Sequence, residues 1–222
     1  MITKLVVMVA ILLPALLLFQ WLNDKHRKNN EAFRKIIHIF HGLTLAILAF
    51  IVPLEALIAL ESVFLVSMVI ARYLSENFSK VPWIKYMGRV YNVGRISYGE
   101  FFFPISVILL VFLADTKWEF AASVLILGLA DAAAALVGKK YGLSTTYTIL
   151  GQKKSVIGSL AFCIVTLAII SGFAQLAEPA IYVSLLSVIW VSLVLTVSEN
   201  IGIYGTDNLL IPLTAVYLLN AL

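Results

Sequence analysis

The distribution of apolar and basic residues constrains this chain more than any other feature. Eight apolar stretches follow one another, at residues 2–22, 36–53, 54–72, 98–114, 118–138, 156–177, 179–198 and 208–222. All but two of the 16 basic residues, Lys4 and Lys117, lie in the first, third and fifth connections between these stretches. Short loops rich in Lys and Arg stay on the cytoplasmic side of a membrane. The pattern therefore predicts cytosolic odd-numbered connections and two termini on the non-cytoplasmic side.

The composition agrees with a membrane protein. Hydrophobic residues make up 62% of the chain and charged residues 13%, and about 20 apolar residues are needed to cross a bilayer. We expect an all-α integral membrane helix bundle of about eight transmembrane helices, or seven because the last stretch is short. No cleavage site for a signal peptide precedes Asn23, and we therefore treat residues 1–222 as one domain. Residues 1–30 then form an extra N-terminal helix and a basic loop.

The net charge of +4 lies mainly in the predicted cytosolic loops. It indicates anionic lipid headgroups or an anionic substrate as partners, and not nucleic acid. A lone cysteine, Cys163, allows neither an internal disulfide nor a zinc site of the usual spacing.

Polar residues inside the apolar stretches gather near the predicted cytosolic face. Arg34, His38 and His41 share one helix face, because they are three or four residues apart. The other members lie close to helix ends on that side, and they are Glu100, Asp131, Glu199, Asp207 and Asn208. Ionisable residues are costly in hydrocarbon and usually serve a function there. Glu61 is expected near the middle of the membrane, as a structural hydrogen-bonding residue or a substrate contact.

The fifth connection, residues 138–155, is the most specific segment. Two glycine-bounded halves flank a β-prone run, which predicts a short cytosolic β-hairpin near residues 143–152. Ser155 is a candidate N-cap of the helix that follows. Lys153 and Lys154 precede that helix start, so the segment could bind phosphate, although it is not a Walker loop.

Several ordered motifs resemble those of the CTP-dependent polyprenol kinases. This family includes phytol, farnesol and dolichol kinases and a CTP-using diacylglycerol kinase. The matching segments are Leu129–Gly142, Lys153–Ser159, Arg34–His38 with Gly42, the Phe103–Pro104 step, and Glu199 followed by Asp207–Pro212. Together they span residues 31–213. The chain departs from the family at Ala130, where Gly is usual, and at Ile157, where Glu is usual.

The resemblance implies transfer of the γ-phosphoryl group of CTP to the primary hydroxyl of a membrane-dissolved isoprenoid alcohol. It implies Mg²⁺ held by Asp131, Asp207 and Glu199, and catalytic roles for Asp131, His38 and Lys154, with either His38 or Asp131 taking the hydroxyl proton. The expected nucleotide-binding residues are Arg34, Lys35, Gly138, Lys139, Gly142, Lys153, Lys154, Ser155, Gly158 and Ser159. The expected substrate contacts are His41, Glu61, Glu100 and Asn208.

Other classes of protein remain open from the sequence. A diacylglycerol kinase would share the motifs, whereas a CDP-lipid-forming cytidylyltransferase should carry a long lysine–aspartate signature that the chain lacks. A CDP-alcohol phosphotransferase should show further aspartates on the helix of Asp131. A membrane transporter would account for Glu61 and the many spans, but it should show inverted repeats or paired broken helices. The sequence does not predict the oligomeric state.

Overall fold

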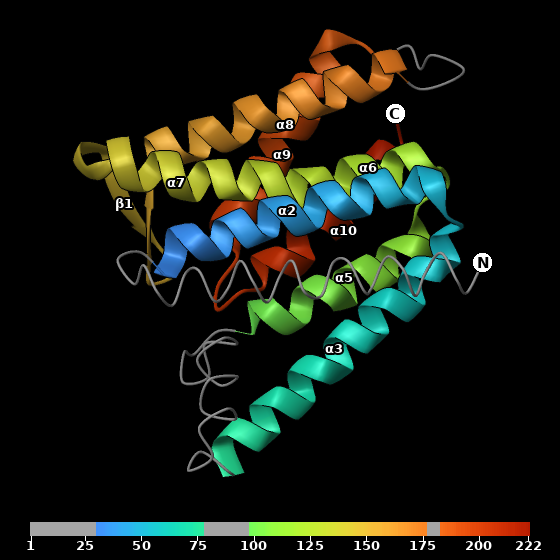
Figure 1. Cartoon of the computed structure of the whole chain (residues 1–222). Helices are drawn as coiled ribbons and strands as arrows, with labels where there is room; N and C mark the ends of the chain where they lie inside the picture. The colour runs from blue at the N-terminus through green and yellow to red at the C-terminus, as the bar shows by residue number, and fades with distance from the viewer. Residues whose placement is uncertain (1–29, 78–97, 177–182) are drawn as a thin grey trace.

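The apolar stretches form helices in a computed structural model, which describes residues 30–77, 98–176 and 183–222 (Figure 1). The helices are α2 (Asn30–Ile51), α3 (Leu54–Asn77), α5 (Gly99–Leu113), α6 (Lys117–Leu125), α7 (Asp131–Tyr141), α8 (Val156–Leu176), α9 (Leu185–Ile201) and α10 (Asp207–Leu219). A π-helical turn, η1 (Ile126–Ala130), joins α6 to α7. The prediction of a helical bundle is confirmed for these residues.

Four helical segments are long and apolar enough to cross a membrane: Arg34–Ile51, Leu54–Leu74, Lys117–Tyr141 and Val156–Leu176. Three shorter apolar helices, α5, α9 and α10, account for the other stretches in the described ranges. The stretch at 2–22 lies outside the described residues. These apolar helices indicate that the chain associates with a membrane, whereas the count of eight spans and the sides of the two termini stay predictions.

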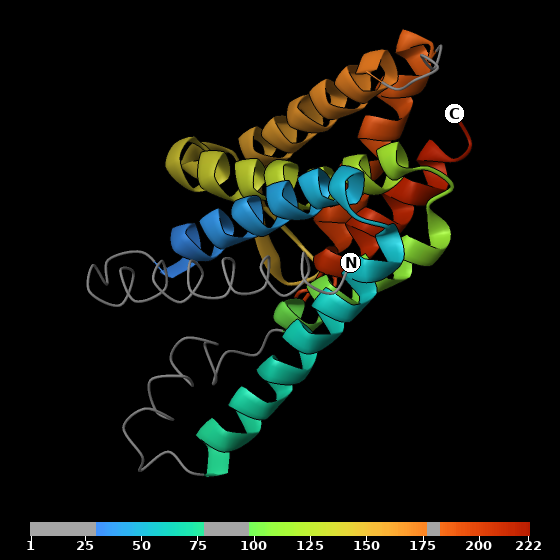
Figure 2. The same cartoon turned by 45° about the vertical axis from the view of Figure 1, so that its right-hand side comes forward.

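Helix α10 lies at the centre of the bundle. It packs against α5, α6 and α9, while α8 packs on α7 and α9, and α2 packs on α6 and η1. Helix α3 packs mainly on α5 and diverges from the other helices toward its Asn77 end in both views (Figures 1 and 2). The core contains Leu45, Val107, Phe120, Val124, Phe162, Leu195 and Ile211.

Helices α5 and α10 are tied together at both ends. At one end, the Asn208 side-chain amide donates to the Gly99 carbonyl oxygen at 2.7 Å, and the Tyr98 backbone N–H donates to the Tyr204 carbonyl at 2.9 Å. At the other end, the Asn220 amide donates to the Leu113 carbonyl at 2.9 Å. The first tie brings the α9–α10 loop to the start of α5.

Two glycines allow α2 to approach the π-helical turn backbone to backbone. A Cβ atom added at Gly128 would lie 3.0 Å from the His38 carbonyl oxygen and 3.2 Å from the Gly42 Cα atom. Because Asp131 follows η1 directly, this close approach brings its carboxylate near the face of α2 that carries Lys35 and His38.

Replacing Gly128 with Val should therefore lower the stability of the folded bundle. The added atoms meet backbone, which cannot swing away, and overpacking of this kind costs about 1–3 kcal/mol. Gly172→Ala is the matched control, because a Cβ atom there would meet nothing within 4 Å, and it should be neutral or slightly stabilising. Thermal unfolding in detergent measures both variants; equal midpoints would contradict the close approach.

The predicted hairpin is confirmed. Strands β1 (Thr146–Ile149) and β2 (Gln152–Ser155) pair antiparallel after a short 3₁₀ turn, η2 (Leu143–Thr145). The loop residues Leu150 and Gly151 have φ angles of 48° and 78°, as a two-residue type I′ hairpin loop requires. The second strand continues to Ser155, three residues past the predicted boundary.

Candidate active site

A buried ion pair joins α2 to the start of α7. The Lys35 ammonium contacts the Asp131 carboxylate, and the two side chains are only 4% and 3% exposed. A lone charge at this depth would be very costly, and each charge offsets the desolvation of the other. The structure thus brings together two residues predicted for the nucleotide and metal sites.

A second ion pair joins the hairpin to α9. The Lys154 ammonium contacts one Glu199 carboxylate oxygen and donates to the Glu199 carbonyl at 3.0 Å. The other carboxylate oxygen, Oε2, is buried and has no hydrogen-bond partner among the residues that the structure describes. Glu199 therefore keeps one oxygen for a further ligand.

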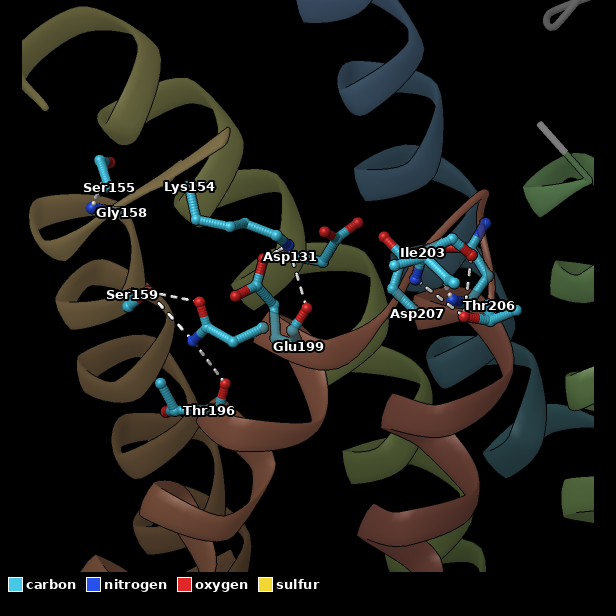
Figure 3. Close-up of polar contacts among 12 residues, drawn as sticks. Asp131, Lys154, Ser155, Gly158, Ser159, Thr196, Glu199, Ile203, Thr206 and Asp207 are labelled. Atoms are coloured by element: carbon cyan, nitrogen blue, oxygen red, sulfur yellow. Dashed lines mark hydrogen bonds and ion pairs between the residues drawn. The ribbon is translucent and has the colours of Figure 1, made fainter. Parts of the chain in front are cut away.

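The two ion pairs belong to one cluster, which Figure 3 shows around Asp131, Lys154, Glu199 and Asp207. The carboxylates of Asp131 and Asp207 are close enough to interact electrostatically with the carboxylate of Glu199. Asp207, at the start of α10, interacts electrostatically with Asp131, with the lysines of both ion pairs and with Arg34. We call these residues the charged cluster: Arg34, Lys35, Asp131, Lys154, Glu199 and Asp207.

The carboxylates of the charged cluster can be tested as a magnesium site. Within the described residues, no three His, Cys, Asp or Glu side chains stand close enough to hold a metal ion by themselves. Mg²⁺, however, usually takes one or two protein carboxylates together with substrate phosphates. Asp131, Asp207 and the unpartnered oxygen of Glu199 are the candidates for the one or two protein ligands of such a shared site. The predicted three-carboxylate site stays a prediction.

His38 lies beside the charged cluster on α2. It is 8% exposed, and its ring packs edge to face with that of Phe103 at 5.2 Å between centroids. Its Nδ1 atom has no hydrogen-bond partner in the described part of the chain. The imidazole is close enough to interact electrostatically with Lys35, Arg34 and Asp131. The unpartnered nitrogen leaves room for one further hydrogen bond to His38.

The residues predicted to contact a substrate lie outside the charged cluster. His41 pairs with Glu61 between α2 and α3, Glu100 lies 3.9 Å from the Arg72 guanidinium, and Asn208 ties α10 to α5. The resemblance implies that all four contact the substrate. In the structure, Asn208 makes a contact between two helices, and His41 and Glu61 form a pair of their own.

The predicted nucleotide-binding residues also divide into two groups. Because side chains alternate along a strand, Lys153 is exposed while Lys154 faces the charged cluster. Lys139 is also exposed at the end of α7. Lys153 and Lys139 therefore do not belong to the charged cluster.

The predicted glycines and Ser155 form a tight junction of α7, β2 and α8. Ser155 Oγ accepts a hydrogen bond from the Gly158 N–H at 3.1 Å, which confirms the N-cap prediction. A Cβ atom added at Gly138 would lie 2.7 Å from that oxygen, and a Cβ atom added at Gly142 would lie closer to it still. The Gly158 amide is thus engaged in capping in this structure.

A hydrogen-bonded triad that the sequence analysis missed holds the hairpin on the bundle. The Tyr147 hydroxyl contacts Ser159 Oγ at 2.7 Å and donates to the Asn200 side-chain oxygen, and Ser159 and Asn200 also bond to each other. Tyr147 is the cross-strand partner of Lys154. Tyr147 thus contacts Asn200, and Lys154 contacts Glu199, the residue before it on α9. The only sequence signal was the alternation in Thr145–Ile149, which fixes the face of Tyr147.

Tyr147→Phe should loosen the hairpin without unfolding the helices. Loss of one buried hydroxyl costs about 1 kcal/mol, which is roughly a fivefold rise in hairpin opening. Limited trypsin digestion measures this opening as the rate of cleavage after Lys153. Tyr141→Phe is the control, because Tyr141 is 59% exposed; equal rates in the two variants would contradict the triad.

The helices and the charged cluster define a membrane-associated protein with a deeply placed site of paired acids and cations. The chain is 28% identical over 186 residues to the phytol kinase of Synechocystis sp., a match that covers 82% of this chain and 76% of that protein. This similarity supports a distant relationship to phytol kinase. No model of a known protein family matches the chain, and no solved structure matches it.

Proposed function

We propose that this protein is a membrane kinase that transfers the γ-phosphoryl group of CTP to the hydroxyl of an isoprenoid alcohol. The observation that carries the proposal is the similarity to phytol kinase along 82% of the chain. The charged cluster contributes Asp131, Lys35, Lys154, Glu199 and Asp207, which are the residue types that phosphoryl transfer requires. That reaction depends mostly on positioning and charge neutralisation.

The location of the charged cluster suits both substrates. A lipid alcohol keeps its chain among apolar side chains and presents its hydroxyl at the polar layer. The triphosphate approaches the same layer from the water side, on which the hairpin with Lys154 is predicted to lie. The predicted cytosolic location of the hairpin agrees with the compartment of a free nucleotide.

Phosphate binding requires the two lysines to change partners. In the structure, Lys35 neutralises Asp131 and Lys154 neutralises Glu199. When a triphosphate enters, both ammonium groups turn to its oxygens, and Arg34 adds a third positive charge. Mg²⁺, when bound, supplies further neutralisation of the phosphate oxygens, with Asp131, Asp207 and Glu199 as the residues that would hold it.

The reaction then moves one proton and one phosphoryl group. The alcohol oxygen attacks the γ-phosphorus atom, its proton passes to His38 or Asp131, and the bond from the γ-phosphorus to the bridging oxygen breaks. The products are the lipid monophosphate and CDP. Among the described residues the Nδ1 atom of His38 has no hydrogen-bond partner, so it can accept a hydrogen bond from the alcohol hydroxyl.

A nucleotide and lipid panel tests the proposal. Purified protein with Mg²⁺ should phosphorylate a C15–C20 prenyl alcohol and prefer CTP to ATP. Farnesol, geranylgeraniol, phytol, dolichol and diacylglycerol are supplied separately, each with CTP and with ATP, and phosphorylated lipid is measured. If diacylglycerol is the one lipid that is phosphorylated, the protein is a diacylglycerol kinase and not an isoprenoid alcohol kinase. A CDP-lipid product would indicate a cytidylyltransferase. If no lipid is phosphorylated with either nucleotide, the kinase function is refuted.

A further inference from the structure

A second polar site lies deeper in the bundle than the charged cluster. His41 Nε2 and Glu61 Oε1 are 2.9 Å apart, and Glu61 is fully buried. His41 follows Lys35 by six residues on α2, which at about 1.5 Å per residue is roughly 9 Å along the helix axis. The pair therefore lies about two helical turns from the Lys35–Asp131 contact.

Aromatic rings surround this pair. The His41 ring stacks on Phe103 with centroids 4.7 Å apart and meets Phe64 edge to face at 5.2 Å. Phe103 also contacts His38, so one ring lies against both imidazoles. We call this region, where α2 faces α3 and α5, the aromatic seam.

One oxygen in the aromatic seam lacks a partner. Glu61 Oε2 is buried and accepts no hydrogen bond from any described residue. If the Glu61–His41 pair is ionic, Oε2 is a carboxylate acceptor. If Glu61 donates a proton from Oε1 to His41, Oε2 is a carbonyl acceptor. Both arrangements require an N–H or O–H donor, and leaving a buried acceptor unpaired costs about 1–3 kcal/mol.

We propose that Glu61 Oε2 accepts a hydrogen bond from the hydroxyl of a long-chain alcohol, which occupies a holding position in the aromatic seam before it reaches the charged cluster. The proposal rests on the proposed function for the identity of the alcohol. The seam provides an acceptor among aromatic and apolar side chains, and a lipid alcohol brings one donor on a hydrocarbon chain. From this position the hydroxyl moves past Phe103 toward His38.

The test compares an alcohol with an ether that cannot donate. Geranylgeraniol and its methyl ether are titrated, without nucleotide or Mg²⁺, into the purified full chain. Wild-type protein should bind the alcohol about tenfold more tightly, as expected for one hydrogen bond to a buried carboxylate. In Glu61→Leu the preference should fall to about one, because Leu keeps the volume but offers no acceptor.

Two further variants make the result decisive. The double variant His41→Phe/Glu61→Leu also removes the imidazole that Glu61→Leu leaves without its partner, so it serves as the test protein if the single variant does not fold. It should also bind alcohol and ether equally. Glu55→Gln, an exposed acid on the same helix, should keep the full preference. No alcohol preference in wild type, or an unchanged preference in both Leu variants, would overturn the holding site.

The binding test is independent of catalysis. If wild type prefers the alcohol but forms no phosphorylated lipid with any nucleotide, the holding site stands and the kinase function fails. If turnover is found while the Leu variants keep the alcohol preference, the kinase function stands and the role of Glu61 fails.

Discussion

Asp131→Asn should reduce lipid phosphorylation by about a thousandfold or more. Asp131 is the most buried acid of the charged cluster, and its carboxylate is a candidate for both magnesium binding and proton transfer. Loss of either contribution lowers the rate of phosphoryl transfer by orders of magnitude. The measurement is turnover of a prenyl alcohol at saturating CTP, with protein folding followed by thermal unfolding in detergent.

Folding must be separated from catalysis in this experiment. Removing one charge from a buried ion pair costs about 3–5 kcal/mol, and Asp131→Asn leaves the Lys35 ammonium without its counter-charge. Lys35→Met/Asp131→Leu removes both charges and should restore stability but not turnover. Asp115→Asn changes an exposed acid and should keep full activity. A folded Asp131→Asn protein with turnover within tenfold of wild type would refute the assignment.

Lys154→Met should lower kcat/KM for the nucleotide by about 10²–10³-fold. Lys154 Nζ reaches Glu199 from the hairpin, and the proposal has it turn from this carboxylate to the triphosphate. Removing a charge that stabilises the transferring phosphoryl group has effects of this size. The measurement is initial rate against CTP concentration at fixed prenyl alcohol.

Lys153→Met provides a control at the adjacent position. Lys153 has the same charge but faces outward from β2, so its effect should be severalfold at most and should shrink as salt screens the exposed charge. Equal losses in the two variants would show that the hairpin binds the nucleotide through its overall charge. Strand alternation would then have no part in the site.

The helices were predictable because their sequences are apolar over nearly their whole length. The hairpin was predictable because glycines bound its β-prone run, and Ser155 because N-cap residues have a narrow chemistry. Asp131, Lys154, Glu199 and Asp207 were identified as candidates from their place near helix ends, and Lys35 from the family resemblance. What the sequence could not provide was their pairing, since Lys35–Asp131 and Lys154–Glu199 contacts depend on how distant helices pack.

The predicted site residues that the structure places outside the charged cluster share one feature. Residues grouped by motif, such as Lys153 with Lys154, are separated by the alternation of a strand. Asn208 lies next to Asp207 but points to the Gly99 carbonyl, because successive helix residues face different directions. Tyr147 and Asn200 were missed because an uncharged residue in a loop or helix carries no signal until its partner is known.

The shortness of α9 has a consequence for the surrounding lipid. Its 17 residues extend about 25 Å at 1.5 Å per residue, less than the roughly 30 Å of a typical hydrocarbon core. Leu186, Trp190 and Val197 are exposed along it. If α9 spans the membrane, as the sequence predicts, the bilayer thins where acyl chains contact it, at a cost of fractions of a kcal/mol per Å. Headgroups and water would then lie closer to Glu199, and under the proposed function the phosphate would travel a shorter distance below the general membrane surface.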